Sequence, residues 1–268
     1  MIEPKDEFII AGDWHGSPGQ ACQVIDYAGR NNIDTIVHAG DFGIWNGDER
    51  FLTKVQRRLE SKGARIYFID GNHENFPRLY EYPIIGDGTR QVRDNIFHIP
   101  RGHRWCWNGI TFMGLGGAPS IDVMHREEGK TWWPEELITE EDVQKAIAPG
   151  PVDVMITHDS PYGAPNSITD DVYGQAMARK YYGADIVDQC TDHRRLLRRV
   201  TDAVIPRMLF HGHYHKYMAG SYYHEEGQHA IVIGLDQGQG PLTTHHTYRF
   251  KFEDEHEELR SMHLLDIK

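Results

Sequence analysis

Five short clusters of polar residues carry side-chain types that bind transition metals. They contain aspartate, asparagine and histidine, whose oxygen and imidazole donors suit borderline cations. In two clusters the candidates stand two positions apart, so that in an extended segment both side chains point the same way. Together they supply two Asp, one Asn and four His, enough for two cations that share a bridging carboxylate. The candidate metal ligands are Asp13, His15, Asp41, Asn72, His158, His213 and His215.

Each cluster follows directly on a short apolar run, which predicts a β-strand. The runs are continuous rather than alternating, as in strands covered on both faces. Helices are predicted at Pro18 to Arg30, with Ser17 as N-cap, and at Asp48 to Ser61. Alternating strands and helices indicate an α/β fold, in which ligands lie beyond the carboxyl ends of the strands. The predicted strands are 8–11, 35–39, 66–69, 152–156 and 208–210.

The rest of the chain shows no internal repeat and no low-complexity segment, so we predict one domain over residues 1–268. A stretch rich in Gly and Trp, about 114–147, is predicted as an active-site loop region. Within it Thr139, with Asp142 three residues on, predicts the start of a helix. Residues of about 160–200 are predicted as an insertion without strong periodicity. The last third predicts β-strands and hairpins at 229–233, 244–252 and 258–264.

Composition and charge exclude several classes of protein. Apolar residues make up 39% and charged residues 25%, as in soluble globular proteins. No apolar run approaches the ~20 residues that a bilayer span needs, and the charged N-terminus does not resemble a secretory signal, so we expect a cytoplasmic protein without a membrane partner. The net charge of −12 argues against a broad nucleic-acid-binding surface, although bound cations would reverse the local field. The three cysteines lie far apart and are expected to be reduced and mostly buried.

The five clusters, in this order, resemble the signature of the calcineurin-like metallophosphoesterase family. That signature is Asp-x-His, Gly-Asp, Gly-Asn-His-Asp/Glu, a later His and Gly-His-x-His, and the resemblance runs from residue 8 to about 215. It implies a four-layer α-β-β-α sandwich, the calcineurin-like phosphoesterase fold, with metals at the strand ends. The matching segments are Gly12-Asp13-Trp14-His15-Gly16, Gly40-Asp41, Gly71-Asn72-His73-Glu74, Thr157-His158-Asp159-Ser160-Pro161 and Gly212-His213-Tyr214-His215.

The resemblance also implies how the ligands divide between two ions. Mn²⁺ or an iron-containing, mixed-valence pair is expected rather than Mg²⁺, because four imidazoles suit softer cations than an oxygen-only site does. Asp41 would bridge the two ions. The ligands of one ion would be Asp13, His15, Asp41 and His215, and those of the other Asp41, Asn72, His158 and His213.

The implied activity is phosphoester hydrolysis by a metal-bridging hydroxide, which two ions ~3.5–4 Å apart make available near neutral pH. The resemblance makes His73 the catalytic group that stabilises the transition state or protonates the leaving alkoxide. The protein-phosphatase branch has Gly-Asp-x-x-Asp-Arg-Gly, whereas Asp41 is followed here by Phe42-Gly43-Ile44-Trp45. We therefore expect a phosphodiesterase for nucleotide-like or cyclic-nucleotide substrates, with phosphomonoesters left open as side substrates.

Two residues of the loop region are candidate substrate-binding groups. Arg126 could pair with a phosphate and Trp133 could stack on a base. The alternative, which we favour, is a structural salt-bridge network of Asp122, Arg126 and Glu135 over packed tryptophans. Further along the chain, the basic run 193–199 could be a nucleic-acid patch, but an amphipathic surface helix is the simpler interpretation.

Other functions share the same residues. A metal-dependent nuclease or a broad phosphomonoesterase would use the same metal core. A non-catalytic scaffold could retain the fold but would have no need of His73 or of every ligand, all of which are present. We therefore expect a small, nucleotide-like phosphoester as the partner, while the sequence leaves the oligomeric state open.

Overall fold

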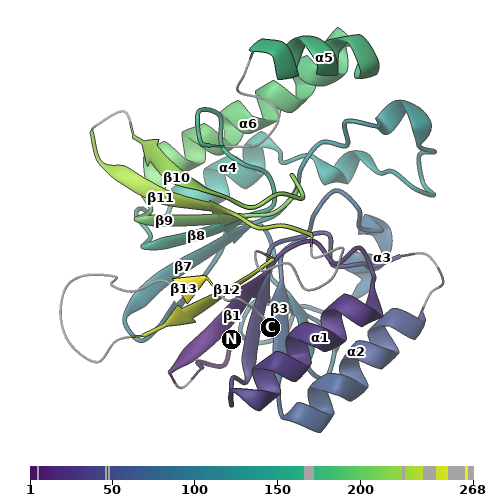
Figure 1. Ribbon diagram of the computed structural model, residues 1–268, viewed down its shortest axis with the longest axis vertical. Coiled ribbons are helices and arrows are strands. Elements are labelled where there is room, and N and C mark those ends of the chain that lie inside the picture. Colours follow the sequence, from purple (N-terminus) through teal and green to yellow (C-terminus); the bar gives the residue numbers. More distant parts are fainter. Residues whose placement is uncertain are drawn as a thin grey trace.

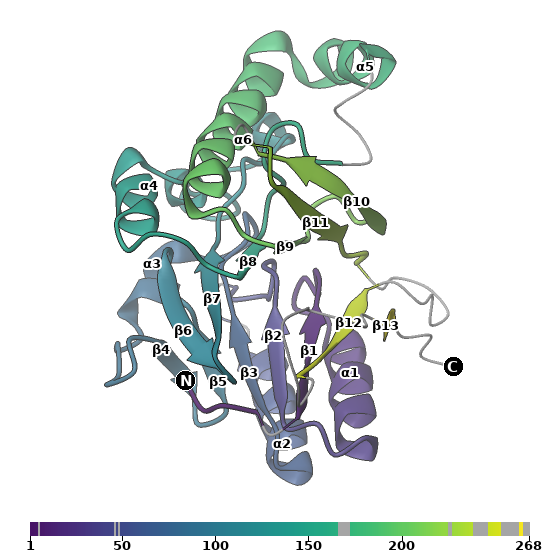
Figure 2. The same cartoon turned by 90° about the vertical axis from the view of Figure 1, so that its left-hand side faces the viewer.

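The computed structural model describes residues 1–4, 6–45, 47, 49–165, 172–224, 227–237, 246–252 and 263–264. Within these residues two mixed β-sheets lie face to face, and helices cover the outer side of each sheet (Figure 1). The turned view in Figure 2 shows the same layers from the side. The α/β, four-layer α-β-β-α fold expected from the sequence is thereby confirmed. None of the helices in the described part of the chain is long and apolar enough to cross a membrane.

The first sheet has seven strands in the order β13-β12-β1-β2-β3-β5-β4. Its central strands β1, β2, β3 and β5 are parallel, so their carboxyl ends meet at one edge. β12 pairs antiparallel with β1, β13 with β12, and β4 with β5. The strands are β1 (Glu7–Ala11), β2 (Thr35–His38), β3 (Arg65–Phe68), β4 (Arg90–Arg93), β5 (Ile96–His98), β12 (Thr247–Lys251) and β13 (His263–Leu264).

The second sheet has six strands in the order β10-β11-β9-β8-β7-β6. β7, β8, β9 and β11 are parallel neighbours, and the outer strands β6 and β10 run antiparallel to them. The strands are β6 (His103–Trp107), β7 (Ile110–Leu115), β8 (Val154–Thr157), β9 (Met208–His211), β10 (Met218–Tyr223) and β11 (His229–Gly234).

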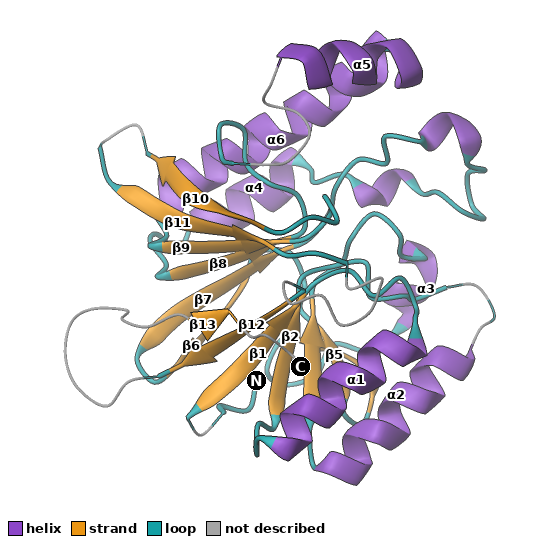
Figure 3. Cartoon of the chain, in the orientation of Figure 1, coloured by secondary structure: helices purple, strands orange, loops and turns teal. Residues whose placement is uncertain are grey.

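Helices form the two outer layers (Figure 3). α1 and α2 pack on the first sheet, and α4 and α6 pack on the second. The helices are α1 (Pro18–Arg30), α2 (Glu49–Lys62), α3 (Phe76–Glu81), α4 (Glu140–Ile147), α5 (Val172–Tyr182) and α6 (Ala184–Val204), with short 3-10 turns η1 (Val123–His125) and η2 (Pro134–Glu136).

Alternation along each strand sorts the apolar side chains into three cores, because successive residues point to opposite faces. In β1, Ile9 packs against the helices of the first layer, whereas Phe8 and Ile10 pack between the sheets. In β9, Leu209 packs against α4 and α6, whereas Phe210 packs between the sheets. Both sheets are therefore buried on both faces, which explains the continuous apolar runs of the sequence.

The elements predicted around the polar clusters are confirmed. The five predicted strands are β1, β2, β3, β8 and β9, and no boundary differs by more than two residues. Helix 18–30 is α1, and helix 48–61 is α2, with Asp48 outside the described residues. Thr139 and Asp142 form a capping box at the start of α4. Of the C-terminal predictions, 229–233 is part of β11, and 244–252 contains β12, with 244 and 245 outside the described residues. Of 258–264, only 263–264 is described, and these two residues form β13.

Two expectations need correction. The segment 160–200 lacks strong periodicity in the sequence, yet α5 and most of α6 lie within it. Leu197 and Val200 of α6 are fully buried against the second sheet, so the amphipathic-helix interpretation of 193–199 is the one that agrees with the structure. The cysteines are free, as expected, but not mostly buried, since Cys106 is exposed and the other two are half-buried. The single-domain organisation stays a prediction.

Candidate metal centre

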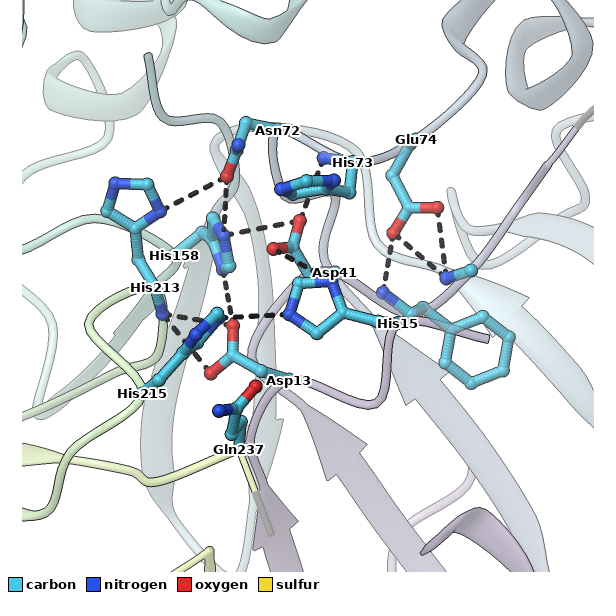
Figure 4. A network of polar contacts seen from close by, with 12 residues as sticks. Asp13, His15, Asp41, Asn72, His73, Glu74, His158, His213, His215 and Gln237 are labelled. Atoms are coloured by element: carbon cyan, nitrogen blue, oxygen red, sulfur yellow. Dashed lines mark hydrogen bonds and ion pairs between the residues drawn. The ribbon is translucent and has the colours of Figure 1, made fainter. Parts of the chain in front are cut away.

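The seven candidate ligands come together where the carboxyl ends of the two sheets meet (Figure 4). The loops after β1, β2 and β3 bring four of them from the first sheet, and the loops after β8 and β9 bring three from the second. Figure 4 shows their side chains around a common centre. From the first sheet come Asp13, His15, Asp41 and Asn72, and from the second His158, His213 and His215.

One group of four ligand atoms fits a single cation. Asp13, His15, Asp41 and His215 each offer one atom, and these atoms all lie within 4.8 Å of one another. The Nε2 atoms of His15 and His215 are 2.9 Å apart, and His15 Nδ1 is 3.6 Å from Asp41 Oδ2. Two imidazole nitrogens this close need a hydrogen or a cation between them, because facing lone pairs repel. The donor set of two carboxylates and two imidazoles suits a transition metal.

A second group forms on the other side of Asp41. Asn72 Oδ1 lies 3.1 Å from both His158 Nε2 and His213 Nδ1, and His158 Nε2 lies 3.4 Å from Asp41 Oδ1. His158 Nδ1 is 2.8 Å from the backbone oxygen of Ala39 and donates to it, so the lone pair of a neutral ring is at Nε2. Oxygen and nitrogen lone pairs thus converge, which is the arrangement that a bound cation satisfies.

The buried carboxylates favour a positive charge at this place. Asp13 and Asp41 are almost completely buried, and burial raises the pKa of Asp13 to about 8. Burial alone would lower the pKa of His158, but the carboxylates of Asp41 and Asp13 raise it to about 10. A proton on His158 therefore stabilises the same carboxylates that a metal ion would stabilise.

Several candidate ligands have a left-handed backbone, which is uncommon for residues other than glycine. Such conformations cost on the order of 1–3 kcal/mol each and concentrate at functional sites. Hydrogen bonds between the ligand loops hold them: Asp41 Oδ1 accepts from the backbone nitrogen of His73 at 2.8 Å, and Asp13 Oδ1 accepts from that of His213 at 3.0 Å. The ligands with positive φ are His15 (46°), Asp41 (55°), His213 (68°) and His215 (52°).

Glycines before the ligands allow one ligand loop to approach another closely. A Cβ atom at Gly40 would lie 2.2 Å from His158 Nδ1, and one at Gly71 would lie 2.1 Å from Asp41 Oδ1. No side chain fits at these distances. The glycines of the Gly-Asp and Gly-Asn motifs are therefore required by contact with a ligand on a neighbouring loop.

Glu74 holds the turn that carries Asp41. Its buried carboxylate accepts hydrogen bonds from the backbone nitrogens of Phe42 at 2.6 Å, Gly43 at 3.2 Å and Ile44 at 2.6 Å. Three donors from consecutive residues fix the path of this turn. This contact gives a structural reason for the acidic residue at the end of the Gly-Asn-His-Glu motif.

His73 lies beside the ligand groups, not within either of them. Its ring centroid is 4.9 Å from that of His15, and Arg126 Nη2 lies 2.9 Å from His73 Nε2. Burial lowers the pKa of His73, the Asp41 carboxylate opposes this change, and the Arg126 cation adds to it. The site thus has a partly accessible imidazole next to the proposed ligands, with a guanidinium in contact with it.

The two candidate substrate-binding residues differ in their surroundings. Arg126 Nε is 2.7 Å from Asp122 Oδ1, as in the predicted salt-bridge network, but the guanidinium also contacts His73. The contact that the structure gives for Glu135 is made by its backbone oxygen, with a different arginine. Trp133 is only 9% exposed. Burial favours packing as the role of Trp133, whereas Arg126 contacts both Asp122 and His73.

Ser120 and Glu136, for which the sequence pattern indicates no role, orient Asn72. Asn72 Nδ2 donates to Ser120 Oγ at 3.0 Å, and the Ser120 hydroxyl donates to Glu136 Oε2 at 2.7 Å. The backbone nitrogen of Ser120 donates to the other carboxylate oxygen at 2.6 Å. Because an amide nitrogen only donates, the Ser120 hydroxyl must accept from the Asn72 amide. The Asn72 oxygen is then left facing His158 and His213.

Comparison with known proteins identifies the class. The family model described as calcineurin-like phosphoesterase matches residues 7–217. The chain therefore belongs to the calcineurin-like phosphoesterase family, which assigns it to the metal-dependent hydrolases of phosphoesters. A search among curated proteins found no match.

Comparison with solved structures found several similar chains. A dimetal phosphatase from Danio rerio has a TM-score of 0.54 and 16% sequence identity, covering 93% of this chain and 93% of that chain. A protein from Thermus thermophilus has a TM-score of 0.49 at 9% identity, covering 86% of this chain and 89% of that one. A purple acid phosphatase from yellow lupin has a TM-score of 0.49 at 14% identity, and the match covers 91% of this chain and 48% of that one. At such identities the likeness to the Danio rerio protein concerns the fold alone.

Proposed function

We propose that this protein is a two-metal phosphodiesterase that hydrolyses nucleotide-like or cyclic-nucleotide phosphodiesters. The observation that carries the proposal is the convergence of two ligand groups on either side of Asp41. Family membership supports the reaction class. The proposed ligands of one ion are Asp13, His15, Asp41 and His215, and those of the other are Asp41, Asn72, His158 and His213.

Mn²⁺ or an iron-containing pair, when bound, would neutralise charge on the phosphoryl oxygens and lower the pKa of water. Hydrogen bonds within the chain orient two of the proposed ligands before any ion binds. The hydrogen bond from His158 Nδ1 to Ala39 directs Nε2 inward, and the hydrogen bond from Asn72 to Ser120 directs the amide oxygen inward. Such outer contacts fix ligand orientation and contribute to metal affinity.

We propose His73 as the catalytic group. It is within reach of a substrate bound at the ligand groups, and its side chain has no part in either group. An anionic phosphoryl group beside the ring would raise its pKa and thus oppose the effects of burial and Arg126. A protonated imidazole can then donate its proton to the leaving oxygen. Arg126, next to the same ring, is proposed to bind a phosphoryl oxygen.

The segment after Asp41 favours a diester over a monoester. In the protein-phosphatase branch this segment carries an Asp-Arg pair, but here Phe42 and Ile44 are fully buried and bring no charge to the site. A diester has one negative charge fewer than a monoester dianion, so it needs less compensating positive charge. The net charge of −12 also favours a small substrate over a nucleic acid. We include in the proposal a single domain over 1–268 and a cytoplasmic location, as expected from the sequence.

Hydrolysis assays with Mn²⁺-loaded protein test this function. We expect bis-p-nitrophenyl phosphate to be hydrolysed with a higher kcat/KM than p-nitrophenyl phosphate, and a panel of 2′,3′- and 3′,5′-cyclic nucleotides to include a substrate. A higher kcat/KM for the monoester would indicate a phosphomonoesterase, and preferential cleavage of plasmid DNA or oligonucleotides a nuclease. Inactivity of the fully metal-loaded protein on every phosphoester would contradict an enzymatic function. It would favour a non-catalytic scaffold that retains the fold.

A further inference from the structure

Trp45 presents an exposed indole at the edge of the candidate metal centre. Its Nε1 donates to the backbone oxygen of His73 at 3.0 Å. Its six-membered ring also lies against Gly16, the residue after His15, where an added Cβ atom would be 3.3 Å from the ring. The indole therefore contacts both the segment that carries the proposed catalytic group and the segment that carries a proposed ligand.

The exposure of Trp45 sets it apart from the other tryptophans. All six tryptophans lie in the described part of the chain, and Trp45, at 41%, is the most exposed. Trp14, Trp107 and Trp133 are buried, with exposures of 0%, 1% and 9%. An indole that is exposed to water beside a binding site lacks the stabilisation that burial in the core would give. Such a ring is suited to contact a ligand.

Trp45 is also anchored at its backbone. Arg78 donates to the backbone oxygen of Trp45, and the same guanidinium pairs with Glu49 at the start of α2. Together with the hydrogen bond of the indole to His73, these contacts hold the residue at both ends. A ring that is fixed before binding loses little conformational entropy when a ligand stacks on it.

A groove begins at Gly16, the residue against which the indole packs. Gly16 lines a groove of about 480 Å³ between the N-terminus of α1 and the start of α2. Arg50 and Lys54 line the same groove, together with Glu49. Gly16 thus lies between the groove and the indole, and it directly follows the proposed ligand His15.

We propose that Trp45 forms a stacking subsite for the base of a nucleotide-like phosphoester whose phosphate is bound at the metal centre. This inference rests on the proposed function and names the part of the substrate that a stacking residue recognises. It moves the stacking role that the sequence suggested for Trp133 to a different tryptophan. Because every base has an aromatic face, the subsite is expected to favour nucleotides over base-free phosphates and to discriminate little among the bases.

Equilibrium binding tests the subsite directly. The probes are AMP and ribose 5-phosphate, which share the phosphate and the sugar and differ in the base. By isothermal titration calorimetry, Mn²⁺-loaded wild-type protein is expected to bind AMP about 5- to 100-fold more tightly than ribose 5-phosphate, the range that stacking on one base gives. Trp45→Leu should reduce this ratio to near one, because leucine keeps apolar bulk but lacks an aromatic face.

Two further variants test whether the ratio depends on the aromatic ring of Trp45. One removes only the hydrogen bond to His73, and the other removes an exposed aromatic ring elsewhere. Trp45→Phe removes the hydrogen bond to His73 but keeps a ring, so most of the ratio should remain. Tyr223→Leu, at the end of β10, removes another exposed aromatic ring (70% exposed) and should leave the ratio unchanged. A Trp45→Leu variant that keeps both its metal content and the wild-type ratio would overturn the subsite.

The outcomes for the subsite and for the proposed function are distinct. Wild-type protein that hydrolyses bis-p-nitrophenyl phosphate but binds the two probes equally would overturn the subsite and leave the phosphodiesterase intact. Metal-loaded protein that neither binds a phosphate probe nor hydrolyses a phosphoester would overturn the proposed function and the subsite with it.

Discussion

His73 performs different tasks with its backbone and its side chain. The backbone nitrogen donates to Asp41 Oδ1, and the backbone oxygen accepts from the Trp45 indole. The imidazole instead contacts Arg126 and lies against the ring of His15. The backbone contacts persist after substitution, so the contribution of the side chain can be measured separately.

For His73→Ala we expect a loss of activity without a loss of metal. General acid catalysis typically contributes about 10²- to 10⁴-fold, so kcat should fall by that order while metal content stays near wild type. Assay of bis-p-nitrophenyl phosphate hydrolysis together with elemental analysis checks this. Loss of both metals in the variant would show that His73 supports the metal site. His103→Ala, on β6 of the second sheet, is a matched control that should change neither quantity.

Arg126→Ala is expected to raise KM for a nucleotide substrate by about 10-fold or more, since a charge-assisted hydrogen bond to phosphate contributes roughly 1.5–3 kcal/mol. The comparison variant is Arg199→Ala, whose guanidinium forms an exposed ion pair with Glu140 between α6 and α4. Steady-state kinetics of both variants gives the answer. An unchanged KM for Arg126→Ala would leave the residue with the structural pairing to Asp122 alone.

At the residue scale, the sequence predicted which side chains converge but not what orients them. Asp, Asn and His after apolar strands are informative because their types suit metals and strand ends meet at one sheet edge. Ser120 and Glu136 have no such signature, and they act on a residue that is distant in sequence. Trp45 was visible only as a departure from the family pattern, because its exposure follows from the packing of two loops.

At the element scale, the loop region between β7 and α4 supports the second ligand group. Ser120→Ala removes the acceptor that orients the Asn72 amide, so the affinity of the second metal ion should weaken about 10- to 100-fold. The first ion should bind as in wild type. Metal titration of the apoprotein resolves the two steps, and equal affinities in variant and wild type would contradict this role. Ser160→Ala is a suitable control, because the buried Ser160 hydroxyl has no hydrogen-bond partner among the described residues.

The same region should give a pH-dependent stability. Burial raises the pKa of Glu136 from 4.5 to about 7. A carboxyl group whose pKa is higher in the folded state stabilises the fold fully below pH 4.5, and this contribution is lost as pH rises through about 7. The loss amounts to about 3 kcal/mol for a shift of this size. Glu136→Gln cannot titrate, so its unfolding free energy should lack this decline.

Urea unfolding of metal-free wild type and Glu136→Gln between pH 5 and 8 checks this prediction. The difference between their unfolding free energies should change in that interval and level off above it. A constant difference across the interval would mean that the carboxyl pKa is not raised in the folded protein.

Elements were predictable where burial on both faces imposes a continuous apolar run. Strands β4 to β7, at or near the sheet edges, were not predicted. β6 illustrates the reason, since Trp105 and Trp107 point inward while Arg104 and Cys106 are more accessible, so polar and apolar residues alternate. α6 was missed over most of its length because its buried positions include His193, Arg194 and Thr201 as well as apolar residues. Burial of these α6 residues depends on tertiary contacts, which the local sequence pattern does not show.

At the scale of the whole molecule, the two sheets meet at the metal centre. Asp13, Asp41 and Asn72 belong to loops of the first sheet, and His158 and His213 to loops of the second. An ion bound by ligands from both sheets binds the folded state and not the unfolded chain. Metal binding should therefore stabilise the entire fold.

Chelation should accordingly lower the melting temperature, and Mn²⁺ should restore it. Free metal at about 100 times Kd adds roughly 2.7 kcal/mol, which corresponds to a rise in Tm of about 5 °C or more for a protein of this size. Differential scanning calorimetry with EDTA and then with Mn²⁺ measures the change. Asp41→Asn should show a much smaller response, and a Tm that does not depend on metal in wild type would contradict the two-sheet site.

The pairing of β1 with β12 has a consequence for synthesis on the ribosome. Glu7 at the start of the chain pairs with Lys251, and Ala11 pairs with Thr247. During translation, the outer edge of β1 stays without its native partner until residues 247–251 have emerged. An uncovered edge of this kind is open to pairing with other nascent chains, which makes this step a point at which chaperones would protect the protein.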